Sequence, residues 1–247
     1  MGNLHQGHQV LFSKAPHNTI KVVTIYVNPL QFDRNDDYQN YPRSLQTDLE
    51  VCMQNNITLV YVPKGDISNE IVIEKSIDLP KFTRYLCGQK REGHFLGVYK
   101  IVKYLFSIIN PDFACFGKKD YQQLLLIKYI ANTYFPRTNI IDVDTVRDMN
   151  NVALSSRLTR LSKESLSLTS RIYETLKNIK SELSKDSLFN KLKEEGIDYL
   201  ETYEIHVEYL DLRSLITLEE ESDKLKRCGI FIACYVDDVR LIDNIEI

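Results

Sequence analysis

Short β-branched runs alternate with amphipathic segments along the first two thirds of this 247-residue chain. A buried-strand pattern at 20–27 is followed by a helical pattern at 44–55, where Leu45, Leu49 and Met53 share one face. Such alternation implies a parallel sheet with helices on both of its faces. The other expected strands are 57–62, 112–116 and 139–143, and the other expected helices are 97–109 and 121–134. We therefore predict an α/β fold built on a Rossmann-like parallel-sheet domain.

The pattern changes after about residue 148. The elements expected there are helices at 162–184 and 187–195, followed by half-buried strands at 199–207, 230–235 and 239–245. This order is typical of a small α+β domain. The sequence thus predicts two domains, a Rossmann-like domain over 1–147 and a smaller C-terminal domain over 148–247.

Composition narrows the class of protein. A net charge of −3 without a basic tail argues against nucleic acid as the main partner, because binding to phosphate backbones needs a positive surface. Five cysteines without a C-x-x-C pair indicate reduced thiols and a cytoplasmic location. No apolar run is long enough to span a bilayer, and no signal-peptide pattern is present. We expect a soluble cytoplasmic protein without a membrane partner.

Two histidines, His5 and His8, lie in a segment that reads as a loop entering a helix. Gly2 and Gly7 allow close approach of the backbone, and the free N–H groups of a first helical turn favour anionic oxygens. Imidazoles can donate hydrogen bonds to phosphate without carrying a permanent charge. The motif therefore indicates a phosphate site. The alternatives are two surface histidines and, for each of His5 and His8, a capping or packing role.

Two further segments offer groups that suit a triphosphate. Gly117-Lys118-Lys119-Asp120 follows an expected strand and precedes an expected helix, so it falls at the sheet edge where ligands gather. Leu154-Ser155-Ser156-Arg157 supplies two hydroxyls and a guanidinium that can hold two oxygens at once. Read alone, Ser-Ser-Arg is common surface sequence; its place among the other motifs favours a phosphate role.

Seven motifs together resemble the pantothenate synthetase (pantoate–β-alanine ligase) family of the H-x-G-H nucleotidyltransferase superfamily in order and spacing. They are 1–8, 27–32, 41–43, 93–95, 117–123, 154–157 and 240–244. The resemblance spans nearly the whole chain, with weak stretches at about 63–80 and 165–195.

This resemblance implies an ATP-dependent condensation of pantoate with β-alanine to pantothenate. A pantoyl adenylate is the intermediate, and pyrophosphate and AMP are released. It also implies Mg²⁺ accompanying ATP, a homodimer, an N-terminal domain that binds nucleotide and pantoate, and a C-terminal lid. The alternatives are another H-x-G-H nucleotidyltransferase and a catalytically degenerate paralogue.

Residue roles follow from the resemblance position by position. His8, His5, Lys119 and Arg157 are the expected catalytic groups, and Gln31 and Gln123 the expected pantoate ligands. The expected ATP-binding residues are Met1, Gly2, Asn3, Leu4, His5, Gln6, Gly7, His8, Gly117, Lys118, Lys119, Asp120, Val146, Leu154, Ser155, Ser156 and Arg157. Asp120 could equally cap the helix that begins at Tyr121, and Asn28 is expected to fix the loop that carries Gln31. The sequence identifies no metal ligands.

The chain departs from the family pattern at several places. Glu92 replaces a proline, Lys118 stands where a glutamate is usual, and Leu158 replaces a polar residue. A loop expected between Pro63 and Asp78 is missing. The family also places a strand and a Val-Pro-Thr-like segment before the residue that is Met1 here, so the first sheet strand is missing. We expect an incompletely defined N-terminus; the alternative is a product that lacks this sheet strand.

Overall fold

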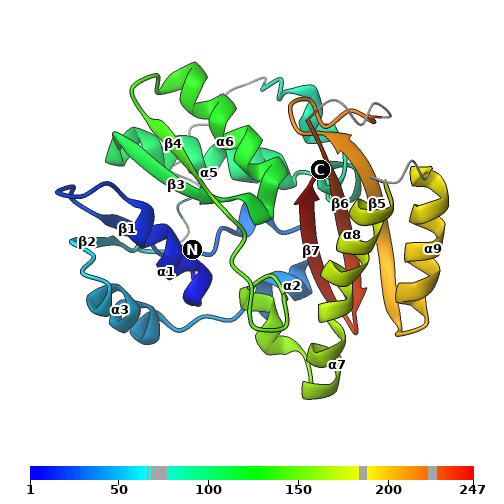
Figure 1. Ribbon diagram of the computed structural model, residues 1–247. Helices are drawn as coiled ribbons and strands as arrows, with labels where there is room; N and C mark the ends of the chain where they lie inside the picture. Colours follow the sequence, from blue (N-terminus) through cyan, green and yellow to red (C-terminus); the bar gives the residue numbers. More distant parts are fainter. Residues whose placement is uncertain (66, 68–76, 184–187, 222–226) are drawn as a thin grey trace. The chain divides into compact units, whose positions relative to one another are not determined.

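A computed structural model describes residues 1–65, 67, 77–183, 188–221 and 227–247 (Figure 1). The stretch between Pro63 and Asp78, where the family's loop is expected to be missing, lies largely outside these described residues. The chain forms two compact units, Met1–Val146 and Arg147–Ile247. None of the described helices is long and apolar enough to cross a membrane.

The first unit contains two pairs of parallel strands. β1 (Val22–Thr24) pairs with β2 (Leu59–Tyr61), and β3 (Phe113–Gly117) pairs with β4 (Asn139–Val143). The predicted α/β class and parallel pairing are confirmed, but the described strands form two two-stranded sheets rather than one continuous sheet.

β1 and β2 are shorter than the predicted strands at 20–27 and 57–62. Strand propensity favours the longer runs, but only Val23 and Ile25 of the first run are buried, and Ile20 is 71% exposed. Beyond β1 the backbone pairs with the start of the chain instead. The Tyr26 N–H donates to the Met1 carbonyl at 2.7 Å.

Helices and short 3-10 turns surround these strands. They are α1 (Gln6–Lys14), η1 (Pro29–Gln31), α2 (Asn35–Gln39), α3 (Leu45–Gln54), η3 (Lys81–Arg84), α4 (Cys87–Lys90), α5 (His94–Ile109), η4 (Lys118–Asp120) and α6 (Tyr121–Tyr134). α5 begins three residues before the predicted start, because Gly93 at φ 76° provides a left-handed N-cap. Its buried residues Phe95, Val98 and Phe106 belong to the core, as do Leu126 and Ile130 of α6.

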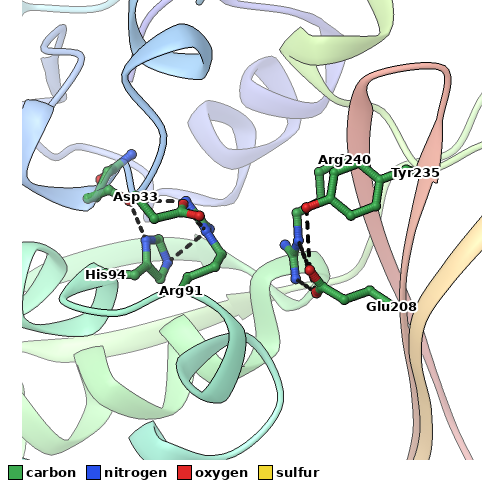
Figure 2. Close-up of polar contacts among 7 residues, drawn as sticks. Asp33, Arg91, His94, Glu208, Tyr235 and Arg240 are labelled. Carbon is green, nitrogen blue, oxygen red and sulfur yellow. Dashed lines mark hydrogen bonds and ion pairs between the residues drawn. The ribbon is translucent and has the colours of Figure 1, made fainter.

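The second unit contains a three-stranded antiparallel sheet in the order β5-β6-β7. Its elements are η5 (Ser156–Arg160), α7 (Lys163–Leu168), α8 (Ser170–Leu183), α9 (Phe189–Glu201), β5 (Ile205–Ser214), β6 (Cys228–Val236) and β7 (Val239–Glu246). Apolar residues of α8 and α9 share one core with the sheet. On this sheet Arg240 forms a half-buried ion pair with Glu208 at 2.5 Å (Figure 2).

Two predicted boundaries in this unit were wrong. The single helix expected at 162–184 is interrupted at buried Thr169, whose hydroxyl and N–H both bond to the Leu166 carbonyl. The strand expected at 199–207 begins only at Ile205, because α9 continues to Glu201 and Glu204 turns at φ 58°.

Candidate active site

His5 and His8 form a reciprocal cap at the start of α1. The His5 ring Nδ1 accepts the Gly7 N–H at 3.1 Å, and the His8 Nδ1 accepts the His5 N–H at 3.1 Å. The two rings lie 4.0 Å apart between centroids. The segment expected to be a loop entering a helix is therefore confirmed as one.

This cap also decides which ring nitrogen carries the proton. Because each Nδ1 accepts a backbone N–H, the proton of each neutral imidazole resides on Nε2. Burial, then the charge of Lys119, lowers the pKa of His5 to about 4. Burial, then neighbouring His5, lowers the pKa of His8 to about 3. At neutral pH both side chains are uncharged Nε2–H donors at a helix N-terminus.

A buried carboxylate, Asp48, holds the loop that precedes this helix. Its oxygens accept the Leu4 N–H at 2.6 Å and the Asn3 N–H at 3.0 Å, and Asn3 adopts φ 52°. The Asp48 residue is only 2% exposed. Two charge-assisted bonds from one carboxylate fix the backbone just before His5.

Asp48 corrects the predicted orientation of α3. The expected apolar face was Leu45, Leu49 and Met53, but Leu45 is 46% and Met53 76% exposed. The buried positions are Asp48 and Cys52, one turn apart. The demand of two backbone N–H groups for an acceptor outweighs the apolar pattern. Periodicity alone does not distinguish Asp48 from Glu50, the exposed acidic residue on the same helix.

Lys119 and Asp120 belong to the same neighbourhood as the histidines. Lys119 is close enough for its charge to lower the pKa of both His5 and His8, and it lies 3.8 Å from the Asp120 carboxylate. Asp120 is the N-cap residue of α6 but makes no side-chain capping bond, so the capping alternative was wrong. Lys118 instead pairs with Asp144 beyond β4 at 2.7 Å.

Gln31 ends a 3-10 turn that Asn28 holds in place, as predicted. The buried Asn28 side chain accepts the Leu30 N–H at 3.2 Å and donates to the Gly97 carbonyl at 3.1 Å. Its amide also lies 3.5 Å from the Gln31 Oε1. A Cβ at Gly97 would lie 2.0 Å from the Leu30 carbonyl oxygen, so only glycine permits this contact.

The two glutamines at the start of α6 differ in environment. Gln123, the expected pantoate ligand, is half-buried. The Gln122 side chain is buried and donates to the Phe82 and Tyr85 carbonyls while it accepts the Cys87 N–H at 3.1 Å. Sequence reasoning missed this anchoring role of Gln122, because its partners lie 35 to 40 residues away.

The remaining expected ATP residues lie at the end of the first unit and in the second. Val146 is the last residue of the first unit. In the second, Ser155 caps η5 by accepting the Arg157 N–H at 3.3 Å, and Ser156 is buried. Leu158 packs against the core of this unit, which accounts for an apolar residue there. The predicted contact of Leu154–Arg157 with phosphate stays a prediction.

A buried ion pair holds the segment that begins the second unit. The Arg147 guanidinium donates to both carboxylate oxygens of Asp243 at 2.6 and 2.8 Å and stacks on the Tyr173 ring at 3.4 Å. Asp148 then accepts the Asn150 and Val152 N–H groups. This pair gives the 240–244 motif a structural role.

No group of three or more His, Cys, Asp or Glu side chains that could hold a metal ion is found within the described part of the chain. What the first unit does bring together is two neutral imidazoles, a helix N-terminus and an ammonium. These groups suit a polyanion such as a nucleoside triphosphate. The parallel α/β unit and this site define a nucleotide-binding protein of the histidine-motif type.

Comparison with known proteins identifies the family. The model of the pantoate-beta-alanine ligase family matches residues 1–246. Pantothenate synthetase of Aliivibrio fischeri is 36% identical over 251 residues, covering 100% of this chain and 86% of the relative. That of Neisseria meningitidis serogroup C is 38% identical over 250 residues, covering 100% and 90%. The chain belongs to the pantoate–β-alanine ligase family.

Solved structures of the same family are also similar to this chain. Pantothenate synthetase from Thermus thermophilus superposes with a TM-score of 0.91 at 31% identity, covering 99% of this chain and 90% of that one. Pantoate-beta-alanine ligase from Francisella tularensis, complexed with beta-gamma ATP and beta-alanine, gives a TM-score of 0.82 at 31% identity, covering 99% and 86%.

Proposed function

We propose that this chain is an ATP-dependent ligase that condenses pantoate with β-alanine to pantothenate, releasing AMP and pyrophosphate. Family membership over residues 1–246 supports this function, as does the relative whose structure holds an ATP compound and β-alanine. The observation that carries the proposal is the neutral His5–His8 pair at the start of α1, with Lys119 beside it.

In the first step a pantoate carboxylate oxygen attacks the α-phosphorus of ATP, and the bond from that phosphorus to the bridging oxygen breaks. Pyrophosphate leaves with the electron pair. The nucleophile is already ionised, since carboxylic acids have pKa values of about 4. Catalysis therefore rests on in-line placement and on neutralising the leaving group.

The site residues suit this task. The Nε2–H groups of His5 and His8 donate to phosphate oxygens, and the α1 N-terminus adds backbone N–H donors. Neutral imidazoles avoid repulsion from Lys119, whose ammonium carries the positive charge. As charge develops on pyrophosphate, these fixed donors stabilise it without reorganisation.

In the second step the free amine of β-alanine attacks the acyl carbon of pantoyl adenylate. A C–N bond forms, the amine loses a proton, and the C–O bond to the phosphate breaks to release AMP. Gln31 and Gln123 hold pantoate through both steps, because an amide offers a donor and an acceptor to hydroxyl and carboxylate groups.

The remaining assignments complete the proposal. The first unit is a Rossmann-like domain that binds nucleotide and pantoate, with Val146 contacting adenine through its backbone. The second is a lid that contributes Leu154–Arg157 to the phosphates. ATP would carry Mg²⁺, whose charge would screen the departing pyrophosphate. The enzyme acts in the cytoplasm as a homodimer.

ATP–pyrophosphate exchange tests the first step in isolation. We expect exchange that requires pantoate, does not require β-alanine, and falls by at least about a hundredfold in Lys119→Ala. Lys128→Ala is the matched control, because Lys128 lies on α6 and pairs with Asp142. Exchange driven by a phosphorylated acceptor instead of pantoate contradicts the proposal and favours another nucleotidyltransferase. An absence of both exchange and ATP binding contradicts it and favours a degenerate paralogue.

A further inference from the structure

Three side chains outside the predicted site form a network at the backbone of Gln31. Arg91, just after α4, and His94, the first residue of α5, bond to its carbonyl, and Asp33, just after η1, pairs with Arg91 (Figure 2). We call them the Gln31 bracket. His94 belongs to the 93–95 motif of the family resemblance.

Arg91 uses each of its guanidinium nitrogens. Its Nε donates to the Asp33 carboxylate at 2.7 Å, one terminal nitrogen donates to the Gln31 carbonyl at 3.0 Å, and the other lies 3.4 Å from the His94 Nε2. The Arg91 side chain is only 11% exposed. A lysine could not make these three contacts, because its ammonium is a single point charge.

His94 supplies the second donor to the same carbonyl. Its Nδ1 lies 2.6 Å from the Gln31 oxygen, and a carbonyl only accepts, so Nδ1 carries the proton. The Nε2 lone pair then faces Arg91. Burial, then the charge of Arg91, lowers the pKa of His94 to about 3, so the ring stays neutral. Two donors thus meet on one backbone oxygen.

Further contacts constrain the same turn. Asn28 caps η1, and Gly97 of α5 lies directly against the Leu30 carbonyl. A turn held both by side chains and by close contact with a helix backbone leaves Gln31 little freedom except at its side-chain torsions. Such rigidity is what placing one amide against a small substrate requires.

We propose that Arg91 and His94, braced by Asp33, are positioning residues that fix the pantoate-binding amide of Gln31. This proposal rests on the proposed function. The bracket touches no reacting atom; it acts through the Gln31 backbone. Its loss therefore raises KM for pantoate and leaves KM for ATP nearly unchanged.

An isosteric pair of substitutions isolates the His94 donor. In His94→Asn the side-chain NH₂ occupies the place of Nδ1–H, whereas His94→Leu has a similar branched shape without a donor. We expect His94→Leu to raise KM for pantoate about tenfold, the worth of one buried hydrogen bond. We expect His94→Asn to stay within about twofold of the parent and both variants to keep KM for ATP.

Arg91→Lys tests the same idea by a second route. We expect Arg91→Lys to raise KM for pantoate several-fold and to leave KM for ATP unchanged, because the lysine keeps the positive charge but lacks the several N–H donors of the guanidinium. Arg84→Ala is the matched control, since Arg84 forms an exposed pair with Asp78 at 3.2 Å. If His94→Leu does not fold, Arg91→Lys decides the question with the same two constants.

Two results overturn the proposal. One is equal pantoate KM in His94→Asn and His94→Leu; the other is a rise in KM for ATP as large as that for pantoate. Both results require that the parent enzyme is active, because KM is measured relative to it. If the parent shows no pantoate-dependent exchange, the proposed function itself is wrong, so the two failures are distinguishable.

Discussion

Removal of the Asp48 carboxylate tests whether the histidine loop owes its shape to one buried side chain. Asp48 accepts two backbone N–H groups at 2.6 and 3.0 Å and is 2% exposed. Hydrogen bonds to a charged group contribute about 1.5–3 kcal/mol each, and an orphaned buried donor costs about 1–3 kcal/mol. Asp48→Asn keeps one acceptor oxygen but turns an NH₂ toward the other N–H.

From these terms we expect Asp48→Asn to lower the free energy of unfolding by about 2–3 kcal/mol. The loop precedes the predicted phosphate donors, so part of this free energy is lost from ATP binding. If the whole of a loss of about 3 kcal/mol came from ATP binding, KM for ATP would rise roughly a hundredfold, which is the upper limit of the effect. KM for pantoate should change far less, since Gln31 is held by other residues.

The assays are urea unfolding and initial rates with ATP and pantoate varied separately. Glu50→Gln is the control, because Glu50 lies on the same helix, is exposed, and bonds only to Gln46 among the contacts found for its side chain in the described residues. We expect the control to stay within about 0.5 kcal/mol. Parental stability together with parental KM for ATP in Asp48→Asn would refute the reasoning.

Three further predictions concern stability. The pKa of His94 is about 3 when folded and near 6.5 when unfolded, so its contribution to stability is present above pH 6.5 and is lost as pH falls. His5 and His8 titrate in the same direction in parent and variant, so between pH 6.5 and 5 we expect the parent to lose about 1.6 kcal/mol more than His94→Asn, measured by urea midpoints; equal losses in the two proteins would contradict this. Asp243→Ala should lower the free energy of unfolding by about 3–5 kcal/mol, because it removes the carboxylate partner of the buried Arg147 guanidinium. The control Lys191→Ala, which breaks an exposed pair, should have little effect, and equal urea midpoints for the two variants would contradict this prediction. Gly97→Ala should lower the free energy of unfolding by at least about 1–3 kcal/mol and raise KM for pantoate, because the added Cβ would lie 2.0 Å from the Leu30 oxygen. An unchanged melting temperature would contradict this prediction.

The features that sequence predicted best depend on local pattern. The loop entering a helix at His5–His8 follows from residues within four positions of each other, and the reciprocal cap confirms it. Asn28 likewise caps the turn three residues from Gln31. The α/β class followed from alternation of strand and helix periods, which does not depend on tertiary detail.

The features that could not be predicted from the sequence depend on hydrogen-bond partners far apart in the chain. Asp48 accepts N–H groups 44 and 45 residues away, and the Gln122 amide bridges carbonyls 37 and 40 residues away. Periodicity placed Met53 on the apolar face and gave no sign that Asp48 is buried, because it registers hydrophobicity but not the need of buried backbone groups for acceptors. Strand lengths failed similarly, since hydrogen-bonding partners rather than propensity limit β1 and β2.

Pantoate labelled with ¹⁸O in both carboxylate oxygens tests whether the pantoate carboxylate attacks the α-phosphorus of ATP within this site. The products are analysed by mass spectrometry after complete turnover with β-alanine. We predict one ¹⁸O in the phosphate of AMP, one in the amide carbonyl of pantothenate, and none in pyrophosphate. Unlabelled AMP, or label in pyrophosphate or inorganic phosphate, would contradict it.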